Sequence, residues 1–109
     1  MALAEKKCAP CASNMTALPA EEAQKLHAEL QGWQLKEKRI SKSFKFDNFE
    51  DAMKLAQKIA VVAEQEGHHP DLHIRWGELS VEVWTHKIGA LTENDFILAA
   101  KIDRCASES

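Results

Sequence analysis

Two adjacent histidines and a third one further along the chain are the residues whose types and spacing could best carry chemistry. His68 and His69 stand directly before Pro70, and His86 follows later in the sequence. Proline favours an extended turn, so the two adjacent imidazoles cannot both point into a core. Unperturbed histidine titrates near ~6.5 and can therefore donate and accept protons at neutral pH. Together with Glu64, about one helical turn upstream of the pair, these histidines form a candidate acid/base site.

The same histidines allow two other interpretations. Three imidazoles could supply three ligands to a metal ion, although adjacent histidines rarely chelate one ion as HxH or HxxxH pairs do. Histidine also suits the negative C-terminal end of a helix. Spacing alone therefore leaves catalytic, metal-binding and structural roles open for His68, His69 and His86. The other two, His27 and His73, are interpreted as ordinary polar residues of a helix and a strand.

The cysteines add a second motif, because Cys8 and Cys11 form a CxxC pair while Cys105 stands alone. An odd count does not resemble the disulfide framework of a small secreted domain. A CxxC pair can be half of a zinc site or a redox pair. No second CxxC or HxxxH pair completes a zinc site, and no strand precedes the motif. We therefore interpret the pair as reduced thiols in an N-terminal extension and expect no metal.

Composition limits the class of protein. The chain has 109 residues, 45% of them hydrophobic and 28% charged, which is the size of one globular domain of roughly 100–150 residues. We expect a flexible extension over residues 1–17 and a single domain over residues 18–109. A formal net charge of -3 gives no electrostatic footprint for nucleic acid or an anionic membrane. No apolar run approaches the ~20 residues that span a bilayer, and no signal peptide is recognised, so we expect a cytoplasmic protein.

The elements that position the histidines follow from hydrophobic periodicity. Helical spacing predicts three helices, one from Pro19 to Gly32, one from Asp47 to Gly67, and one that begins at Thr92. Alternation predicts two strand pairs, over residues 33–46 and 72–86. Lys38 and Arg39 form the turn of the first pair, and Gly77 and Glu78 form the turn of the second.

The ends of two helices carry recognisable capping signals. Asp47 with Glu50 resembles a capping box for the middle helix, and Thr92 with Asp95 resembles one for the last helix. Gly67 is predicted to end the middle helix in the left-handed conformation. The second strand pair returns beside its own start, which should bring His86 towards the turn that follows Gly67.

The order α-β-β-α-β-β-α predicts a two-layer α+β sandwich, with three helices on one face of a four-stranded antiparallel sheet. The helices should cover Leu79, Val81 and Val83. Glu82, Trp84 and His86 should then lie on the open face of the sheet. Exposed aromatic side chains and strand edges favour pairing with another chain, so we expect a homo-oligomer formed by a sheet edge or a helix face.

The stretch from Glu64 to Asp103 reads EQEGHHPDLHIRWGELSVEVWTHKIGALTENDFILAAKID and resembles the pterin-4a-carbinolamine dehydratases. That family places an acid four residues before His-His-Pro, then a hairpin that ends in Thr-His, then a Gly-Leu-Thr/Ser-x-x-Asp helix start. Gly32-Trp33 and Phe44-x-Phe46-x-x-Phe49 also agree, the resemblance covers residues 18–104, and the CxxC resembles that of some bacterial members. Two departures are Gly89-Ala90-Leu91 for the usual Gly-Leu and Leu72 for a common aromatic, which should loosen one wall of the pterin pocket.

The resemblance implies a dehydratase that converts 4a-hydroxytetrahydropterin to quinonoid dihydropterin and so recycles the cofactor of aromatic amino acid hydroxylases. It implies no metal and no cofactor for the protein itself. By the same resemblance, His68 and His86 protonate the leaving hydroxyl and accept the N5 proton, His69 holds the pterin, and Glu64 orients an imidazole. Thr85 is expected to line the pterin edge, and the other residues assigned to substrate binding are Gly67, Pro70 and Asp95. The Asp95 carboxylate can also be explained as a helix cap alone.

The resemblance also keeps a second class of function open. Some members of this family act as protein cofactors that stabilise the dimer of a transcription factor through a helix face. The complete histidine set favours catalysis in this chain. The partners expected are a pterin substrate, an aromatic amino acid hydroxylase and further copies of the chain in a homodimer or homotetramer, of which the family suggests the tetramer.

Overall fold

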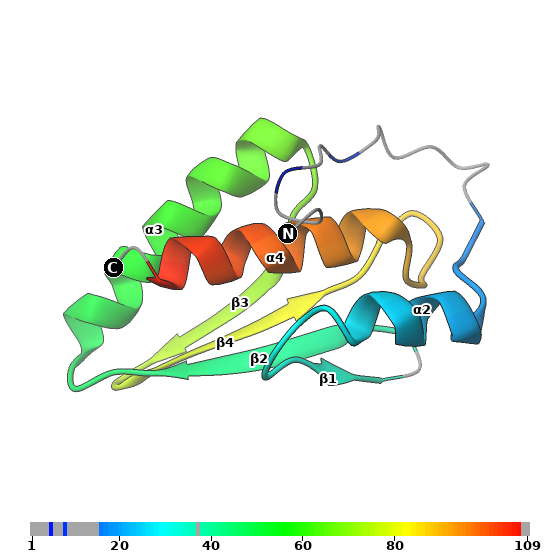
Figure 1. Cartoon of the computed structure of the whole chain (residues 1–109). Coiled ribbons are helices and arrows are strands. Elements are labelled where there is room, and N and C mark those ends of the chain that lie inside the picture. Colours follow the sequence, from blue (N-terminus) through cyan, green and yellow to red (C-terminus); the bar gives the residue numbers. More distant parts are fainter. Residues whose placement is uncertain (1–4, 6–7, 9–15, 37, 108–109) are drawn as a thin grey trace.

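The computed structural model describes Glu5, Cys8, residues 16–36 and residues 38–107. Its sheet has the strand order β1-β2-β4-β3, and every neighbouring pair is antiparallel. Helices α2, α3 and α4 lie on one side of this sheet (Figure 1). The predicted two-layer α+β sandwich is therefore confirmed. The elements are α2 (Ala20–His27), β1 (Gln34–Leu35), β2 (Ile40–Lys45), α3 (Phe49–Glu66), β3 (Asp71–Arg75), β4 (Glu78–Val83) and α4 (Glu93–Ser107).

Helix α3 leads directly into the histidine pair. Its N-cap is Asn48, whose side-chain oxygen accepts the backbone N–H of Asp51 at 2.7 Å. The predicted capping box at Asp47 is therefore wrong by one residue: the side chain of Asn48 accepts the N–H of Asp51, whereas a box at Asp47 would have accepted the N–H of Glu50. Gly67 ends the helix with φ 66, as predicted. Only a residue without Cβ adopts this left-handed geometry at no steric cost.

Helix α2 is shorter than the periodicity predicts. It ends at His27, well before Gly32, and tighter backbone bonds follow, from Glu29 N–H to the carbonyl of Leu26 and from the N–H of Leu30 to the carbonyl of His27. The His27 imidazole lies 2.6 Å from the carbonyl oxygen of Trp33. This contact draws the chain back towards the sheet. His27 thus has the structural role that the sequence predicted.

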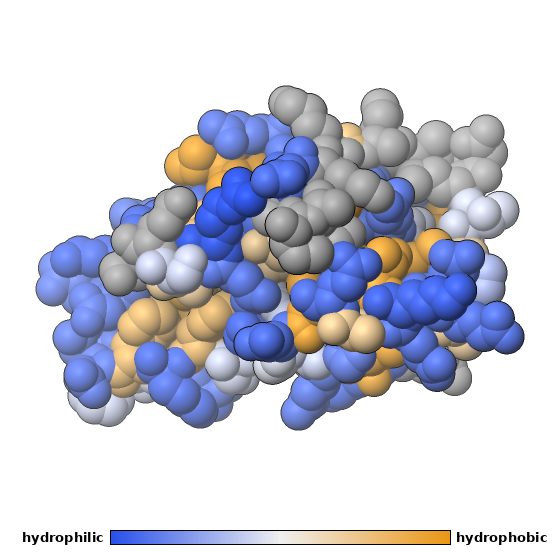
Figure 2. Space-filling model, viewed as in Figure 1, coloured by the Kyte–Doolittle hydropathy of each residue, from blue (hydrophilic) through white to orange (hydrophobic). Residues whose placement is uncertain are grey.

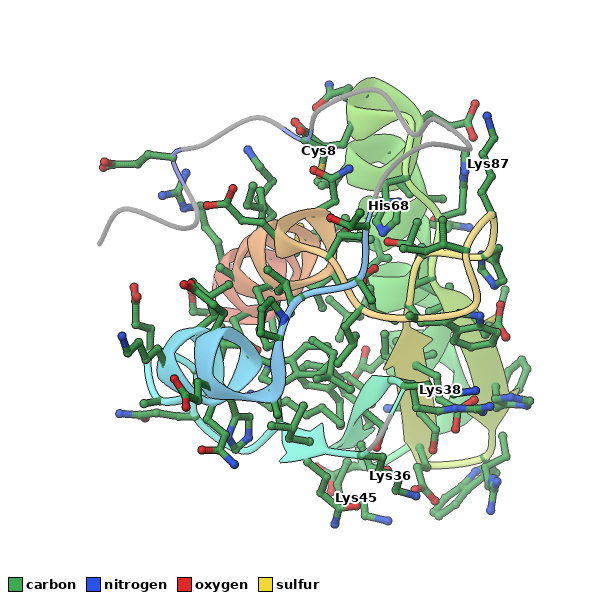
Figure 3. The ribbon with its side chains drawn as sticks, turned by 90° about the vertical axis from the view of Figure 1, so that its right-hand side faces the viewer. Cys8, Lys36, Lys38, Lys45, His68 and Lys87 are labelled. Atoms are coloured by element: carbon green, nitrogen blue, oxygen red, sulfur yellow. The ribbon has the colours of Figure 1, made fainter. Side chains whose placement is uncertain are left out.

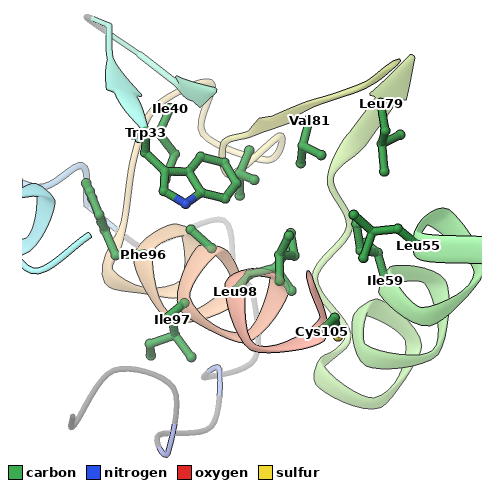
Figure 4. Close-up of a cluster of buried hydrophobic side chains, with 14 of the residues drawn as sticks. Trp33, Ile40, Leu55, Ile59, Leu79, Val81, Phe96, Ile97, Leu98 and Cys105 are labelled. Atoms are coloured by element: carbon green, nitrogen blue, oxygen red, sulfur yellow. The ribbon is translucent and has the colours of Figure 1, made fainter. Parts of the chain in front are cut away.

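The central strand β4 carries the core of the domain. Leu79, Val81 and Val83 are fully buried, as predicted. In the sheet, Val83 pairs with Ile40 of β2 and Val81 with Leu72 of β3. Figure 4 shows Ile40, Leu79 and Val81 facing α3 and α4 across one continuous apolar layer. Burial of this layer outweighs any single polar contact, since each large aliphatic side chain contributes about 1.5–3 kcal/mol.

The opposite face of the sheet is polar. Its rows, read across β2, β4 and β3, are Ser41–Glu82–Asp71, Ser43–Ser80–His73 and Lys45–Glu78–Arg75. His73 therefore lies on the open face, as the sequence predicted. On the face viewed in Figure 2, apolar patches alternate with hydrophilic side chains, and one patch lies between the first turns of α3 and the end of α4. Within the described part of the chain, no helix is long and apolar enough to cross a membrane.

Candidate functional site

His68 lies in the turn that follows α3 and is 4% exposed. The left-handed Gly67 reverses the chain, and the backbone N–H of His68 donates to the carbonyl of Ala63 at 3.2 Å. Its side chain is then directed at the start of α4, where Nε2 lies 2.6 Å from Asp95 Oδ1. Figure 3 shows His68 between the end of α3 and the loop that enters α4.

Asp95 fixes the chemical form of this contact. Its Oδ2 accepts the backbone N–H of Thr92 at 2.8 Å and the hydroxyl of Thr85 at 3.1 Å. The carboxylate half of the predicted capping box of α4 is therefore present, because Asp95 bonds back to the Thr92 N–H, while the Thr92 hydroxyl bonds to Thr85. The same carboxylate also contacts His68. A carboxylate that receives two other donors can only accept a third, so Nε2 of His68 carries the hydrogen. This is the arrangement by which a buried aspartate sets the tautomer of a catalytic histidine in other folds.

Thr85 supports the loop that carries His86. Its side chain is fully buried and its hydroxyl lies 2.8 Å from the hydroxyl of Thr92. The backbone closes the loop, because Thr85 N–H donates to the carbonyl of Ala90 and Gly89 N–H donates to the carbonyl of Thr85. The side chain expected to line a pterin edge thus packs beneath the loop. Asp95 is also 0% exposed, so its contacts are with protein groups.

His86 lies in the loop beyond the end of β4. β4 ends at Val83, so the prediction that the strand extends to His86 is wrong, because the loop hydrogen bonds of Thr85 replace the strand ladder. The side chain is 49% exposed, and Nε2 lies 3.4 Å from Asp71 Oδ1. Its ring packs against Trp84 with 4.3 Å between the ring centroids. The sequence analysis did not single out Asp71, although its position directly after His-His-Pro was the available signal.

His69 faces away from His68, as the adjacent positions require. Its Nε2 lies 2.6 Å from Glu64 Oε2, and the two side chains are 59% and 77% exposed. Glu64 therefore contacts an imidazole, as the resemblance implied, and that imidazole belongs to His69. An exposed pair of this kind contributes little to stability, typically about 0.2–1 kcal/mol. Its carboxylate and imidazole are instead open to a bound molecule.

The hairpin brings the candidate residues to one end of the sheet. Asp71, which follows Pro70, pairs with Glu82 across β3 and β4 and reaches His86 with its side chain. The three candidate histidines each face a different carboxylate, namely Asp95, Glu64 and Asp71. Gly67 and Pro70 shape the turn between them. Among the described residues, no group of His, Cys, Asp and Glu side chains is arranged to hold a metal ion.

Cys8 is the one cysteine of the CxxC pair within the described residues. Its backbone N–H donates to Glu66 Oε1 at 2.8 Å, and its Sγ lies 3.6 Å from the carbonyl of Asn94. Burial, together with the negative charge of Glu66, raises the pKa of the Cys8 thiol to about 12. Reactive cysteines have lowered pKa values, so this thiol has the opposite character. Cys11, and with it the CxxC motif as a pair, lies outside the described residues.

Comparison with known proteins places this geometry in a family. The family model described as "Pterin 4 alpha carbinolamine dehydratase" matches residues 16–105. A Rickettsia canadensis protein named "Putative pterin-4-alpha-carbinolamine dehydratase" is 56% identical over 103 residues, which cover 93% of this chain and 94% of the relative. A Methylococcus capsulatus protein of the same name is 46% identical over 109 residues, with 98% of this chain and 96% of the relative covered.

A solved structure agrees with the fold. The structure described as a "transcriptional coactivator/pterin dehydratase" from Brucella melitensis superimposes with a TM-score of 0.78 at 30% sequence identity. The match covers 84% of this chain and 99% of that one. The family model spans the whole sheet, helices α2 and α3, all but the last turn of α4 and every candidate histidine. This chain belongs to the pterin-4a-carbinolamine dehydratase family.

Proposed function

We propose that the protein removes water from a 4a-hydroxytetrahydropterin and thereby recycles the pterin used by an aromatic amino acid hydroxylase. One observation carries the proposal: each of the histidines His68, His69 and His86 has a carboxylate of its own at the same end of the sheet. An imidazole beside a carboxylate can both receive a proton and return it near neutral pH. Membership of the family agrees with this chemistry.

The reaction requires two proton transfers and no change of oxidation state. The C4a hydroxyl takes one proton and leaves as water, while the N5 lone pair forms the new C4a=N5 double bond. N5 then loses its own proton, which gives the quinonoid dihydropterin. A base and an acid on the protein therefore suffice, and each can be restored by the proton that the other step releases or consumes.

We assign the two transfers to His86 and His68. His86 is half-exposed and has Asp71 beside it, so it can reach a ligand and carry a charge. His68 lies 2.6 Å from the buried Asp95, so a carboxylate orients its imidazole for proton exchange. His69 and Glu64 are the most open of these groups and bind the polar edge of the pterin. Asp95 and Thr85 act as positioning residues from beneath the site.

The test is stopped-flow measurement of the dehydration of freshly generated 4a-hydroxytetrahydropterin. The wild-type protein should accelerate the reaction over buffer, and His86→Ala and His68→Ala should each lose about 10²–10⁴-fold of that acceleration. His73→Ala is the matched control, because His73 is an exposed histidine of β3 that lies on the open face of the sheet. Absence of acceleration by the folded wild-type protein would overturn the proposal.

A second candidate function is partner binding, since the Brucella structure is described as a transcriptional coactivator as well as a pterin dehydratase. The outer face of α3 carries exposed Val61 beside a groove of about 620 Å³ that also includes Phe46 and Lys58. We propose that this face binds a second copy of the chain, giving the expected homo-oligomer. Light scattering tests it: Val61→Asp should reduce the assembly to a smaller species with unchanged turnover per chain, and an unchanged mass would contradict it.

A further inference from the structure

The His86 imidazole is less tightly held by neighbouring groups than the His68 imidazole, the other histidine assigned to proton transfer. His68 is buried and lies 2.6 Å from its carboxylate. His86 follows the end of β4, is half-exposed, and lies 3.4 Å from Asp71. That separation exceeds the 2.7–3.2 Å range of an ordinary N–H···O hydrogen bond. Asp71 can supply charge to His86, but it does not fix the orientation of the ring.

Trp84 supplies the missing constraint. Its indole packs against the His86 imidazole with ring centroids 4.3 Å apart and planes inclined at 54°. Tilted aromatic pairs with this separation are attractive because ring edges and faces carry opposite partial charges. The contact limits the side-chain conformations of His86, since any large rotation about its first torsion angle would remove it. Trp84 and His86 flank the fully buried Thr85; Trp84 is partly buried against the edge of the core, and His86 is half-exposed.

Trp84 is itself contacted by Arg39, which directly precedes β2. The Arg39 guanidinium lies over the indole, with Cζ 4.6 Å from the ring centroid. Arg39 also forms an ion pair with Glu82 at 3.2 Å, and Glu82 stands opposite Asp71 in the sheet. The contacts therefore run without a break from Asp71 through His86, Trp84 and Arg39 to Glu82. Glu82 in turn pairs with Asp71 in the sheet.

We propose that Trp84, clamped by Arg39, is the positioning residue that holds the His86 imidazole for proton transfer. The inference rests on the proposed dehydratase function and deepens it. Trp84 acts through His86 rather than on the pterin, so its loss should lower kcat and leave KM nearly unchanged. Small displacements of a catalytic group are costly: about 1 Å can reduce a rate 10²-fold.

The experiment compares turnover of Trp84→Ala, Trp84→Phe and Trp76→Ala with the wild-type protein. Trp84→Ala should reduce kcat about tenfold, since partial misplacement costs less than removal of the imidazole. Trp84→Phe keeps an aromatic face and should stay within about twofold of wild type. Trp76→Ala is the matched control: this tryptophan is 71% exposed and lies in the β3–β4 turn, at the opposite end of β4 from His86.

A double-mutant cycle separates positioning from general damage to the fold. In the His86→Ala background, Trp84→Ala should cause no further loss of turnover, because the residue through which it acts is gone. NMR provides a readout that does not depend on activity. The His86 ring protons should be displaced by the indole ring current in the wild-type protein, and Trp84→Ala should remove that displacement.

The outcomes distinguish this inference from the proposed function. A wild-type protein that does not accelerate dehydration overturns both. An active wild-type protein whose Trp84→Ala variant keeps full kcat overturns the positioning role alone. The positioning role is also overturned if Trp84→Ala lowers turnover by the same factor in the His86→Ala background as in the wild-type protein, because Trp84 would then act independently of His86. The clamp is supported if kcat falls in Trp84→Ala, is kept in Trp84→Phe, and falls no further when Trp84→Ala is added to His86→Ala.

Discussion

At the scale of single residues, Asp95 makes hydrogen bonds to three different parts of the candidate site. It caps α4 through Thr92, receives the Thr85 hydroxyl and holds Nε2 of His68, all without exposure to solvent. A neutral amide cap has a single acceptor oxygen, so it could not accept at both Oδ1 and Oδ2 as the carboxylate does. The carboxylate therefore serves the His68 side of the network as well as the helix.

Asp95→Asn tests this dual role. An asparagine side chain has one oxygen, so its NH₂ group must face one of the donors that now point at the carboxylate. The free energy of unfolding should fall by about 1–3 kcal/mol, the usual cost of an unsatisfied buried polar group. Turnover should fall as well, because the His68 tautomer is no longer fixed.

The measurements are urea unfolding and stopped-flow dehydration, with Glu93→Gln as the control. Glu93 lies in the same first turn of α4 but is exposed. Its loss of charge weakens a favourable interaction with the helix dipole, worth about 0.3–1 kcal/mol. Equal stability losses in the two variants, with unchanged turnover in Asp95→Asn, would contradict the role assigned to Asp95.

At the scale of elements, the turn from α3 to β3 depends on a left-handed residue. Gly67 has φ 66, and an added Cβ would meet no atom within 4 Å. Gly67→Ala should therefore cost only the conformational strain, about 1–2 kcal/mol of unfolding free energy. Gly77→Ala should cost more, because its φ is 76 and its Cβ would lie 3.1 Å from the carbonyl oxygen of Phe46.

Thermal and urea unfolding of the two variants check this order. A turn that tolerates Gly67→Ala without loss would show that the chain can rearrange before His68, and the position of His68 would then not depend on the cap. A Gly77→Ala variant that is more stable than Gly67→Ala would contradict the steric argument. The first outcome also predicts an altered environment for the His68 ring, which NMR can observe.

The elements show how far the sequence reaches. Periodicity identified the helices and strands because each has one apolar face, and Gly67 and the Thr92–Asp95 box were visible as local signals. The errors lie at ends: Asn48 replaces Asp47 as a cap, α2 stops at His27, and β4 stops before His86. Each of these helix and strand ends is set by a few local hydrogen bonds, those of Asn48, of the turn after His27 and of Thr85. Several neighbouring residues could have made such bonds.

The contacts within the site were less accessible to sequence reasoning than the elements. The histidine pair and His86 were recognised by type and spacing, and Glu64 by its place one turn earlier. The contacts of Arg39 with Trp84 and of Asp71 with His86 depend on the register of the sheet. Register is set by the packing of a whole layer, so no local pattern could have assigned these partners.

At the scale of the whole molecule, Cys8 lies against the ends of the two helices that frame the candidate site. It contacts Glu66 at the end of α3 and Asn94 at the start of α4 (Figure 3). Glu66 also forms an ion pair with Lys101 at 3.4 Å. The thiol therefore reports on whether this junction is closed, because only the closed form buries it.

The pKa of about 12 at Cys8 predicts a protected thiol and a pH limit. An unfolded thiol ionises near pH 9.0, so the folded form binds its proton more tightly between these values. The contribution of Cys8 to stability is thus complete below pH 9.0 and is lost as pH rises towards about 12.

In a Cys11→Ser, Cys105→Ser background, alkylation of Cys8 by iodoacetamide at pH 8 should be much slower for the folded protein than for the protein unfolded in urea. Glu66→Gln keeps an acceptor for the Cys8 N–H but removes the charge that opposes the thiolate, so it should accelerate alkylation. Mass spectrometry measures both rates, and a Cys8 that reacts as fast in the folded as in the unfolded chain would show that the junction is open in solution.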